Sequence, residues 1–157
     1  MEVARVHVRS WQAGYRGLLP DAYLDGLRAE DRAQRYRLGS EDVREPATVV
    51  AMEAGVICGF ATTAPARDSD AQEDGELFAL YVDPEWWGRG IGAALISAAR
   101  SRLVDVGFRG AVLWLLAGNA RADRFYRIDR WAPDGSKRTD TVWGVTVDEV
   151  RYRRALL

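Results

Sequence analysis

A glycine-rich stretch, "WWGRGIG" at residues 86–92, stands directly before a segment with helical periodicity. Glycines at the start of a helix let backbone N–H groups approach a ligand closely, and the positive end of the helix dipole favours an anion there. Arg89 adds a cation to the same turn. The stretch therefore indicates a site for a phosphate-bearing ligand, with a glycine-rich helix start that packs beneath another element as the alternative.

The same stretch also fits a looser pattern. Gly88, Gly90 and Ala93 satisfy G-x-G-x-x-G/A, the fingerprint of dinucleotide-binding folds. In those folds the glycines directly follow the first strand, and an acidic residue lies about 20 positions further on, at the end of the second strand. Here residues 83–87 separate strand from glycine, and "AVLWLLAGN" at 111–119 has no acid at its end. The dinucleotide interpretation is therefore disfavoured.

The elements that must position this stretch follow from periodicity and turn residues. They predict the order α-α-β-β-β-α-β-α-β-β, with a right-handed crossover and parallel strands across residues 76–116 and hairpins on either side. This is an α/β (mixed α+β) fold with a mixed sheet and helices on its faces. The expected elements are helices at 3–15 and 18–27, a solvated helix or helical turn at 30–44, a hairpin at 48–63, strands at 76–82 and 111–117, helices at 91–107 and 119–128, and strands at 137–144 and 145–154.

Length and composition set the class of protein. The chain has 157 residues, 48% hydrophobic and 29% charged, which predicts a single globular domain over 1–157. A net charge of -1 without long runs of one sign argues against a nucleic acid partner. We also expect no membrane span, no signal peptide and, with one cysteine, a reducing cytoplasm. The sequence leaves the oligomeric state open, a homodimer included.

Two segments together resemble one family. "ALYVDPEWWGRGIGAALI" at 79–96, followed by "NARADRFYR" at 119–127, resembles the GNAT superfamily of acyl-CoA-dependent N-acyltransferases. Its motifs are Q/R-x-x-G-x-G/A at the start of the central helix, and an Asn followed two helical turns later by an aromatic residue and Tyr. Residues 6–27 also resemble the paired N-terminal helices of one bacterial branch. The resemblance implies a twisted, mostly antiparallel sheet whose central parallel pair splays apart for CoA.

The resemblance also implies a slot for acetyl-CoA, used as a co-substrate without a metal. The splayed strands 76–82 and 111–117 would admit the pantetheine arm, the glycine turn would hold the pyrophosphate, and a residue of the last short helix would pack near the thioester. The implied cofactor-binding residues are Leu80, Val82, Trp87, Gly88, Arg89, Gly90, Gly92, Ala93, Asn119 and Phe125.

Three features depart from the family pattern. Trp87 occupies the position of the family's Gln or Arg, so that side-chain contact to phosphate is absent. Arg130 stands where the family often has Gly before an aromatic residue, which puts the turn after Tyr126 in doubt. The chain begins directly in its first helix, so we expect the family's usual first strand to be missing.

Acetyl transfer to an amine requires a neutral amine, a stabilised oxyanion and a leaving thiolate. The resemblance implies the backbone N–H of Val82 as oxyanion donor and Tyr126 as the group that protonates the thiolate, with a core aromatic as the alternative. Glu76 is the candidate base because period two places it on the face of Phe78 and Leu80, where apolar neighbours raise a carboxyl pKa. The alternative interpretation is that Glu76 is a solvated residue at the end of a loop. The other candidates for the general base are Glu73, Asp74 and Glu53.

Several other side chains have both a functional and a structural interpretation. Trp11 and Tyr15, with Leu18, would shape the acceptor pocket, although aromatic residues at helical spacing are more often core. The acids Asp68, Asp70, Glu73 and Asp74 would attract a cationic amine or form an ordinary solvated loop. His7, the sole histidine, and Cys58 are expected to be buried rather than catalytic.

These observations favour an acetyl-CoA-dependent N-acetyltransferase that acts on a primary amine of a small molecule or peptide. Direct transfer in a ternary complex is expected, because no competent nucleophile is present for a covalent acyl-enzyme. The alternative is a catalytically idle acyl-CoA-binding sensor or interaction module.

Overall fold

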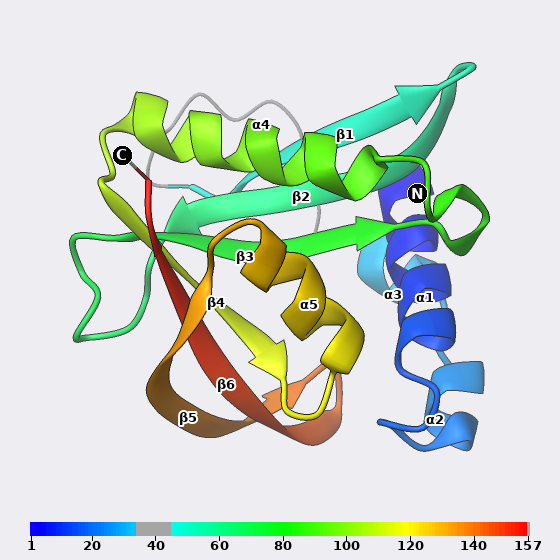
Figure 1. Ribbon diagram of the computed structural model, residues 1–157. Helices are drawn as coiled ribbons and strands as arrows, with labels where there is room; N and C mark the ends of the chain where they lie inside the picture. The colour runs from blue at the N-terminus through cyan, green and yellow to red at the C-terminus, as the bar shows by residue number, and fades with distance from the viewer. Residues whose placement is uncertain (34–44, 157) are drawn as a thin grey trace.

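A computed structural model describes residues 1–33 and 45–156 (Figure 1). The predicted helices and strands occur in the predicted order. The segment predicted as helical at 30–44 begins as a helix, and its residues 34–44 lie outside the described part. The elements are α1 (Glu2–Gly14), α2 (Asp21–Asp25), α3 (Glu30–Ala33), β1 (Ala47–Glu53), β2 (Val56–Pro65), β3 (Gly75–Val82), the 3-10 turn η1 (Pro84–Trp86), α4 (Ile91–Val106), β4 (Gly110–Leu116), α5 (Ala120–Ile128), β5 (Ala132–Val142) and β6 (Val145–Ala155).

The strands form one mixed sheet in the order β1-β2-β3-β4-β6-β5. Every neighbouring pair of these six strands is antiparallel except β3 and β4, which run parallel as the crossover through α4 requires. β5 begins at Ala132, before the predicted start at Lys137, because the turn-like residues between them form an irregularity in the ladder rather than a loop. The expected mostly antiparallel sheet with a parallel pair is confirmed.

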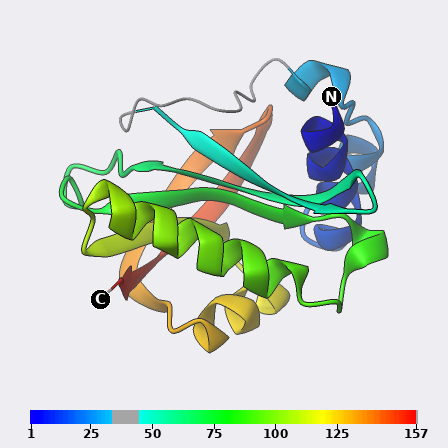
Figure 2. The same ribbon diagram turned by 90° about the horizontal axis from the view of Figure 1, so that it is seen from above.

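Helices cover both faces of the sheet (Figure 2). α4 lies on one face, where its apolar positions at helical spacing are buried against β1, β2 and β3, and Gly107 ends it in the left-handed conformation (φ 113°). α1 lies on the opposite face and packs against β2 and β3. Arg9, near the middle of α1, ties the helix to the segment before the glycine stretch, because its guanidinium lies 2.9 Å from the buried Asp83 carboxylate. None of the described helices is long and apolar enough to cross a membrane.

A bulge in β3 changes which side chains share a face. Thr62 pairs with Ala79 and Thr63 with Leu77, so Phe78 is an extra residue in β3. Leu77 and Leu80 therefore pack in the same cluster beneath α4, whereas Ala79 and Tyr81 face α1. The expectation that Glu76 shares a face with Leu80 is wrong for this reason: strict alternation does not hold across the bulge.

A tight turn ends the β5–β6 hairpin. Trp143 and Gly144 both have positive φ, 51° and 83°, the conformation of the two-residue hairpin turns that match strand twist. The turn packs the Trp143 ring against Trp11 of α1, with ring centroids 5.2 Å apart. The hairpin end is thereby tied to the N-terminal helices across the opening between β3 and β4.

Candidate functional site

β3 and β4 separate soon after they meet. Their parallel pairing extends only from Gly75 and Ala111 to Leu77 and Leu113. Beyond these residues a cavity of about 780 Å³ lies between the strands and is lined by residues of α1, β3, α4, β4, α5 and the β5–β6 hairpin. The unpaired edge of β3 includes Leu80 and Val82, which line the cavity as the family resemblance implies.

The glycine stretch forms one end of this cavity. Gly88 and Gly90 are left-handed, with φ of 76° and 80°, and Gly90 is the N-cap of α4, which no described side chain caps. The first N–H groups of α4 are therefore available to a ligand, as those of an uncapped helix are. Gly92 lies against Phe125, since a Cβ there would be 3.1 Å from that ring. The cavity lining from this stretch consists of Trp86, Trp87, Gly88, Gly90, Ile91, Gly92 and Ala93.

Arg89, the cation predicted to help hold the pyrophosphate, has an exposed side chain in this turn. The Arg89 guanidinium is 4.8 Å from the centre of the Trp86 ring, on the exposed surface. Arg89 is not among the described residues that line the cavity. Trp87 does line it and donates its indole N–H to the Val82 carbonyl at 2.8 Å.

α5 supplies the other side of the cavity. Asn119 caps the helix as predicted, since its side-chain oxygen accepts the Ala122 N–H at 3.1 Å. The cap occupies the amide oxygen and leaves the amide N–H₂ as the group that can face a ligand. Phe125 and Tyr126 pack edge to face with centroids 5.1 Å apart, and both line the cavity. Burial raises the pKa of Tyr126 well above that of free tyrosine, which keeps its hydroxyl protonated.

Glu76 lies in the same cavity at the start of β3 and is only 3% exposed. The Arg67 backbone N–H donates to its carboxylate at 3.4 Å, and the Arg67 guanidinium is 3.7 Å away. Burial raises the pKa of Glu76, and the charge of Arg67 opposes part of that effect. The carboxylate is therefore neither solvated nor neutralised by a close ion pair, which is the environment expected of a general base.

The part of the cavity lined by α1 is aromatic. Trp11 and Tyr15 line it as predicted, with their rings 5.0 Å apart, and both belong to a cluster with Trp143. Burial raises the pKa of Tyr15, and the neighbouring Tyr81 adds to that effect. Leu18 is exposed and is not among the described lining residues.

The acids of the 65–75 loop are largely paired, which favours a structural role over attraction of an amine. Two nitrogens of Arg151 bind Asp70 at 2.6 and 2.7 Å. Asp68 accepts bonds from Arg151 and from the Trp114 indole at 3.2 and 2.9 Å, and Asp74 is bound by Arg153.

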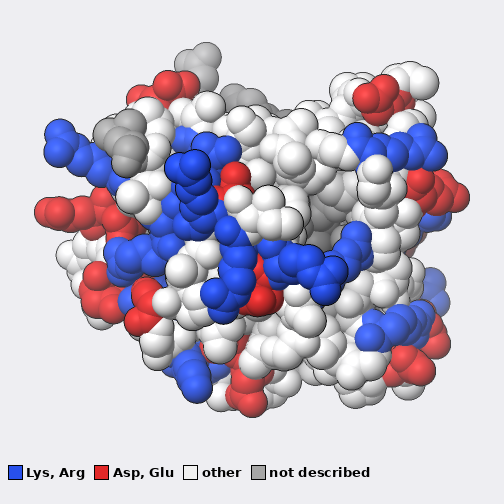
Figure 3. All heavy atoms as spheres, viewed as in Figure 1, with Lys and Arg blue, Asp and Glu red and all other residues white. Residues whose placement is uncertain are grey.

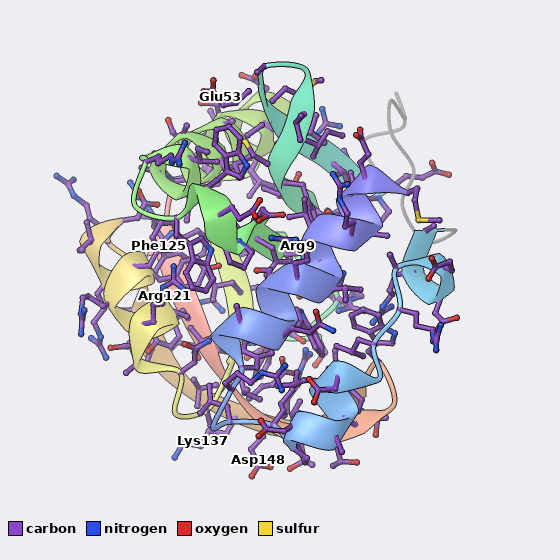
Figure 4. The ribbon with its side chains drawn as sticks, turned by 90° about the vertical axis from the view of Figure 1, so that its right-hand side faces the viewer. Arg9, Glu53, Arg121, Phe125, Lys137 and Asp148 are labelled. Carbon is purple, nitrogen blue, oxygen red and sulfur yellow. The ribbon has the colours of Figure 1, made fainter. Side chains whose placement is uncertain are left out.

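The remaining candidate residues from the sequence are not among the described residues that line the cavity. Glu73 and Glu53 are exposed, and Glu53 lies at the tip of the β1–β2 hairpin (Figure 4). His7 and Cys58 are buried, as expected. Burial lowers the pKa of His7 to about 3, and the Cys58 thiol donates to the Ala51 carbonyl at 3.3 Å.

The polar or aromatic lining residues that sequence reasoning missed include Trp114, Arg121, Arg138 and Glu149. Arg138 stacks 4.1 Å from the centre of Trp114 and bonds Glu149 at 3.0 Å. Arg121 lies two residues after the predicted Asn119, in the first turn of the helix within "NARADRFYR", and this position is the signal that could have identified it. Nothing in the sequence indicates that β5 and β6 reach the cavity, because that depends on how the hairpin folds over β4.

Comparison with known sequences shows which family the chain matches. The model of the acetyltransferase (GNAT) family matches residues 9–129. An uncharacterized N-acetyltransferase of Archaeoglobus fulgidus is 34% identical over 122 residues, which cover 76% of this chain and 80% of the relative. One from Bacillus subtilis is 30% identical over 118 residues, 75% of this chain and 66% of the relative. The mycothiol acetyltransferase of Propionibacterium freudenreichii is 32% identical over 102 residues, and the match covers 64% of this chain but only 31% of that protein.

Solved structures share the fold. A GCN5-related N-acetyltransferase from Rhodopseudomonas palustris superposes with a TM-score of 0.71 at 18% identity, covering 98% of this chain and 87% of that one. The PaiA N-acetyltransferase of Thermoplasma acidophilum, solved in complex with coenzyme A, gives 0.65 at 17% identity, covering 97% and 89%. With the family model matched over most of its length, the chain belongs to the acetyltransferase (GNAT) family.

Proposed function

We propose that this chain transfers the acetyl group of acetyl-CoA directly to a primary amine of a small molecule or peptide, as a cytoplasmic enzyme. The observation that carries the proposal is the convergence of the uncapped α4 N-terminus, Tyr126 and the buried Glu76 on one cavity between splayed strands. The first group suits a phosphate-bearing donor, and the other two supply a protonated hydroxyl and a carboxylate of raised pKa.

We assign each residue a role in the transfer of protons and electrons during the reaction. Glu76, directly or through water, takes the proton that keeps the acceptor amine charged, which frees its lone pair. The amine attacks the thioester carbonyl carbon, and the Val82 backbone N–H stabilises the oxyanion. The carbon–sulfur bond then breaks, and Tyr126 donates a hydrogen bond or a proton to the departing thiolate. The nitrogen loses its second proton, which restores the Tyr126 hydroxyl, so the amide product carries the acetyl group and CoA leaves as the free thiol.

The aromatic wall formed by Trp11 and Tyr15 is proposed to hold the body of the acceptor, at the end of the cavity away from the glycine stretch. The cavity is shared between donor and acceptor without a barrier of described residues between the two ends. This arrangement supports direct transfer, because both substrates can occupy it together.

A panel of primary amines incubated with acetyl-CoA, with release of free thiol as the readout, tests the function. Tyr126→Phe should lower kcat by about 100-fold, the lower end of the effect of a positioned acid, while the Kd for CoA stays near that of the parent chain. Tyr23→Phe is the matched control, since it removes a hydroxyl outside the cavity lining. CoA binding without thiol release for any amine would instead favour an acyl-CoA-binding module.

A further inference from the structure

Trp87 is held rigidly at the position where the family motif has a polar phosphate ligand. Its indole N–H donates to the Val82 carbonyl at 2.8 Å, which ties the ring to the end of β3. The ring lies beside Gly88 and Gly90 in the cavity lining. The indole can offer no charge to an anion, but it offers a fixed aromatic face.

Arg121 occupies that face. Its guanidinium carbon is 3.4 Å from the centre of the Trp87 ring, which is the geometry of a cation–π stack. Arg121 belongs to the first turn of α5 and lines the cavity together with Trp87. Figure 4 shows the Arg121 and Phe125 side chains projecting from α5 toward the splayed strands.

The charge of Arg121 is not neutralised by any carboxylate that the structure describes. By contrast, Arg127 of the same helix binds Asp123 at 2.7 Å, and the neighbouring Arg100 binds Asp129 at 3.0 Å. Arg121 is exposed overall, but partial desolvation lowers its pKa, so part of the guanidinium has lost water without gaining an anion. An anionic ligand in the cavity would supply the missing partner.

The charged side chains around Arg121 also favour an anionic ligand. Figure 3 shows Lys and Arg side chains gathered on the face that carries α5. Arg89, the cation within the glycine stretch, stacks on Trp86 at 4.8 Å and is outside the described lining. Of Arg89 and Arg121, only Arg121 lines the cavity beside the uncapped N-terminus of α4.

We propose that Arg121, positioned by Trp87, binds the pyrophosphate of acetyl-CoA and takes the place of the polar side chain missing at position 87. The inference rests on the proposed function, because it requires CoA to occupy this cavity. A guanidinium suits the role because it stacks on an aromatic ring while its N–H groups remain directed at phosphate oxygens. Trp87 is then a positioning residue and Arg121 a binding residue.

Binding titrations with CoA, dephospho-CoA and pantetheine test the assignment, followed by the quenching of intrinsic tryptophan fluorescence. Arg121→Ala should weaken binding of CoA and of dephospho-CoA by about 10-fold each, the loss expected for one charge-assisted contact. Binding of pantetheine, which has no pyrophosphate, should not change. Arg124→Ala, the same charge change one turn further along α5 and outside the described lining, is the matched control and should retain affinity.

Each other outcome counts against the assignment. Unchanged CoA affinity in Arg121→Ala overturns it, and so does a loss for CoA alone, which would point to the 3′-phosphate. A loss that extends to pantetheine would show a general structural defect and overturn it as well. If the parent chain binds no CoA, the proposed function fails rather than the role of Arg121.

The role of Trp87 is tested separately. Trp87→Ala should weaken CoA binding by a similar factor, and adding Arg121→Ala to it should cause little further loss, because the two residues act as one unit. Trp87→Phe keeps an aromatic face and should be closer to the parent chain. Additive losses in the double variant would overturn the positioning role.

Discussion

Arg67 binds the Glu76 carboxylate with its backbone N–H while its guanidinium remains loosely placed, 3.7 Å from the nearer carboxylate oxygen and stacked on Phe78 at 4.3 Å. The hydrogen bond fixes the carboxylate in the cavity. The guanidinium is largely exposed, so its charge is screened by solvent. This explains why burial, and not the ion pair, decides the direction of the Glu76 pKa.

Glu76→Gln should abolish most turnover yet leave the fold at least as stable at neutral pH. The folded state prefers protonated Glu76, so this group lowers the free energy of unfolding as pH rises from the ordinary glutamate pKa through the raised one. A neutral glutamine does not carry that cost. Urea denaturation at pH 5 and pH 8, compared with kcat and CoA affinity, checks both parts.

Glu73→Gln is the control for that experiment, since Glu73 is exposed and outside the described lining. Its turnover and its stability should follow those of the parent chain at both pH values. A Glu76→Gln variant with parental kcat, or one that loses stability relative to the parent as pH rises, would contradict the assigned role of Glu76.

The buried Arg151 should be essential for stability. It is 4% exposed and binds Asp68, Asp70 and Asp134, so its removal leaves carboxylates without their partner. Arg151→Met should lower the free energy of unfolding by about 3 kcal/mol, as expected when one member of a buried ion pair is lost. Arg109→Met, on the exposed surface, should change it little. Equal denaturation midpoints for the two variants would show that the network contributes nothing.

The sequence predicted the order of elements and the glycine turn because both depend on local periodicity and on residues with special backbone preferences. It predicted the cavity at Leu80, Val82 and Tyr126 through a family motif. The sequence did not predict features that depend on tertiary structure. The bulge at Phe78 inverts the alternation of side chains along β3. The stacking of Arg121 on Trp87 joins two segments that are far apart in the chain. Motif positions alone do not indicate which arginine faces the cavity.

The backbone of the turn after α5 should be strained at Arg130. Arg130 has a φ of 69°, the left-handed region that disfavours side chains with a Cβ. The chain keeps this turn although the family often has glycine here, and the Trp131 N–H bonds the Tyr126 carbonyl at 2.9 Å. Arg130→Gly should therefore raise the free energy of unfolding by about 1 kcal/mol, seen as a higher denaturation midpoint. Arg130→Ala, which keeps the Cβ, should not show this gain.

His7 should make the fold sensitive to acid. Its ring stacks on Tyr81 at 4.8 Å and contacts Trp11 and Phe60, and burial, with a smaller effect of the Arg32 charge, lowers its pKa from 6.5 to about 3. Between these values the unfolded chain binds a proton that the folded chain does not. Stability present above pH 6.5 is therefore lost as pH falls toward 3, by up to about 1.4 kcal/mol per pH unit.

His7→Phe keeps an aromatic ring and removes the titrating group, so the two chains can be compared across pH. The free energy of unfolding of the variant should fall less steeply than that of the parent between pH 6.5 and 4, measured by urea denaturation. The two curves should run parallel above pH 7, because His7 is neutral there in both folded and unfolded chains. Curves that remain parallel down to pH 4 would mean that His7 accepts its proton in the folded state without cost, contrary to its burial among aromatic rings.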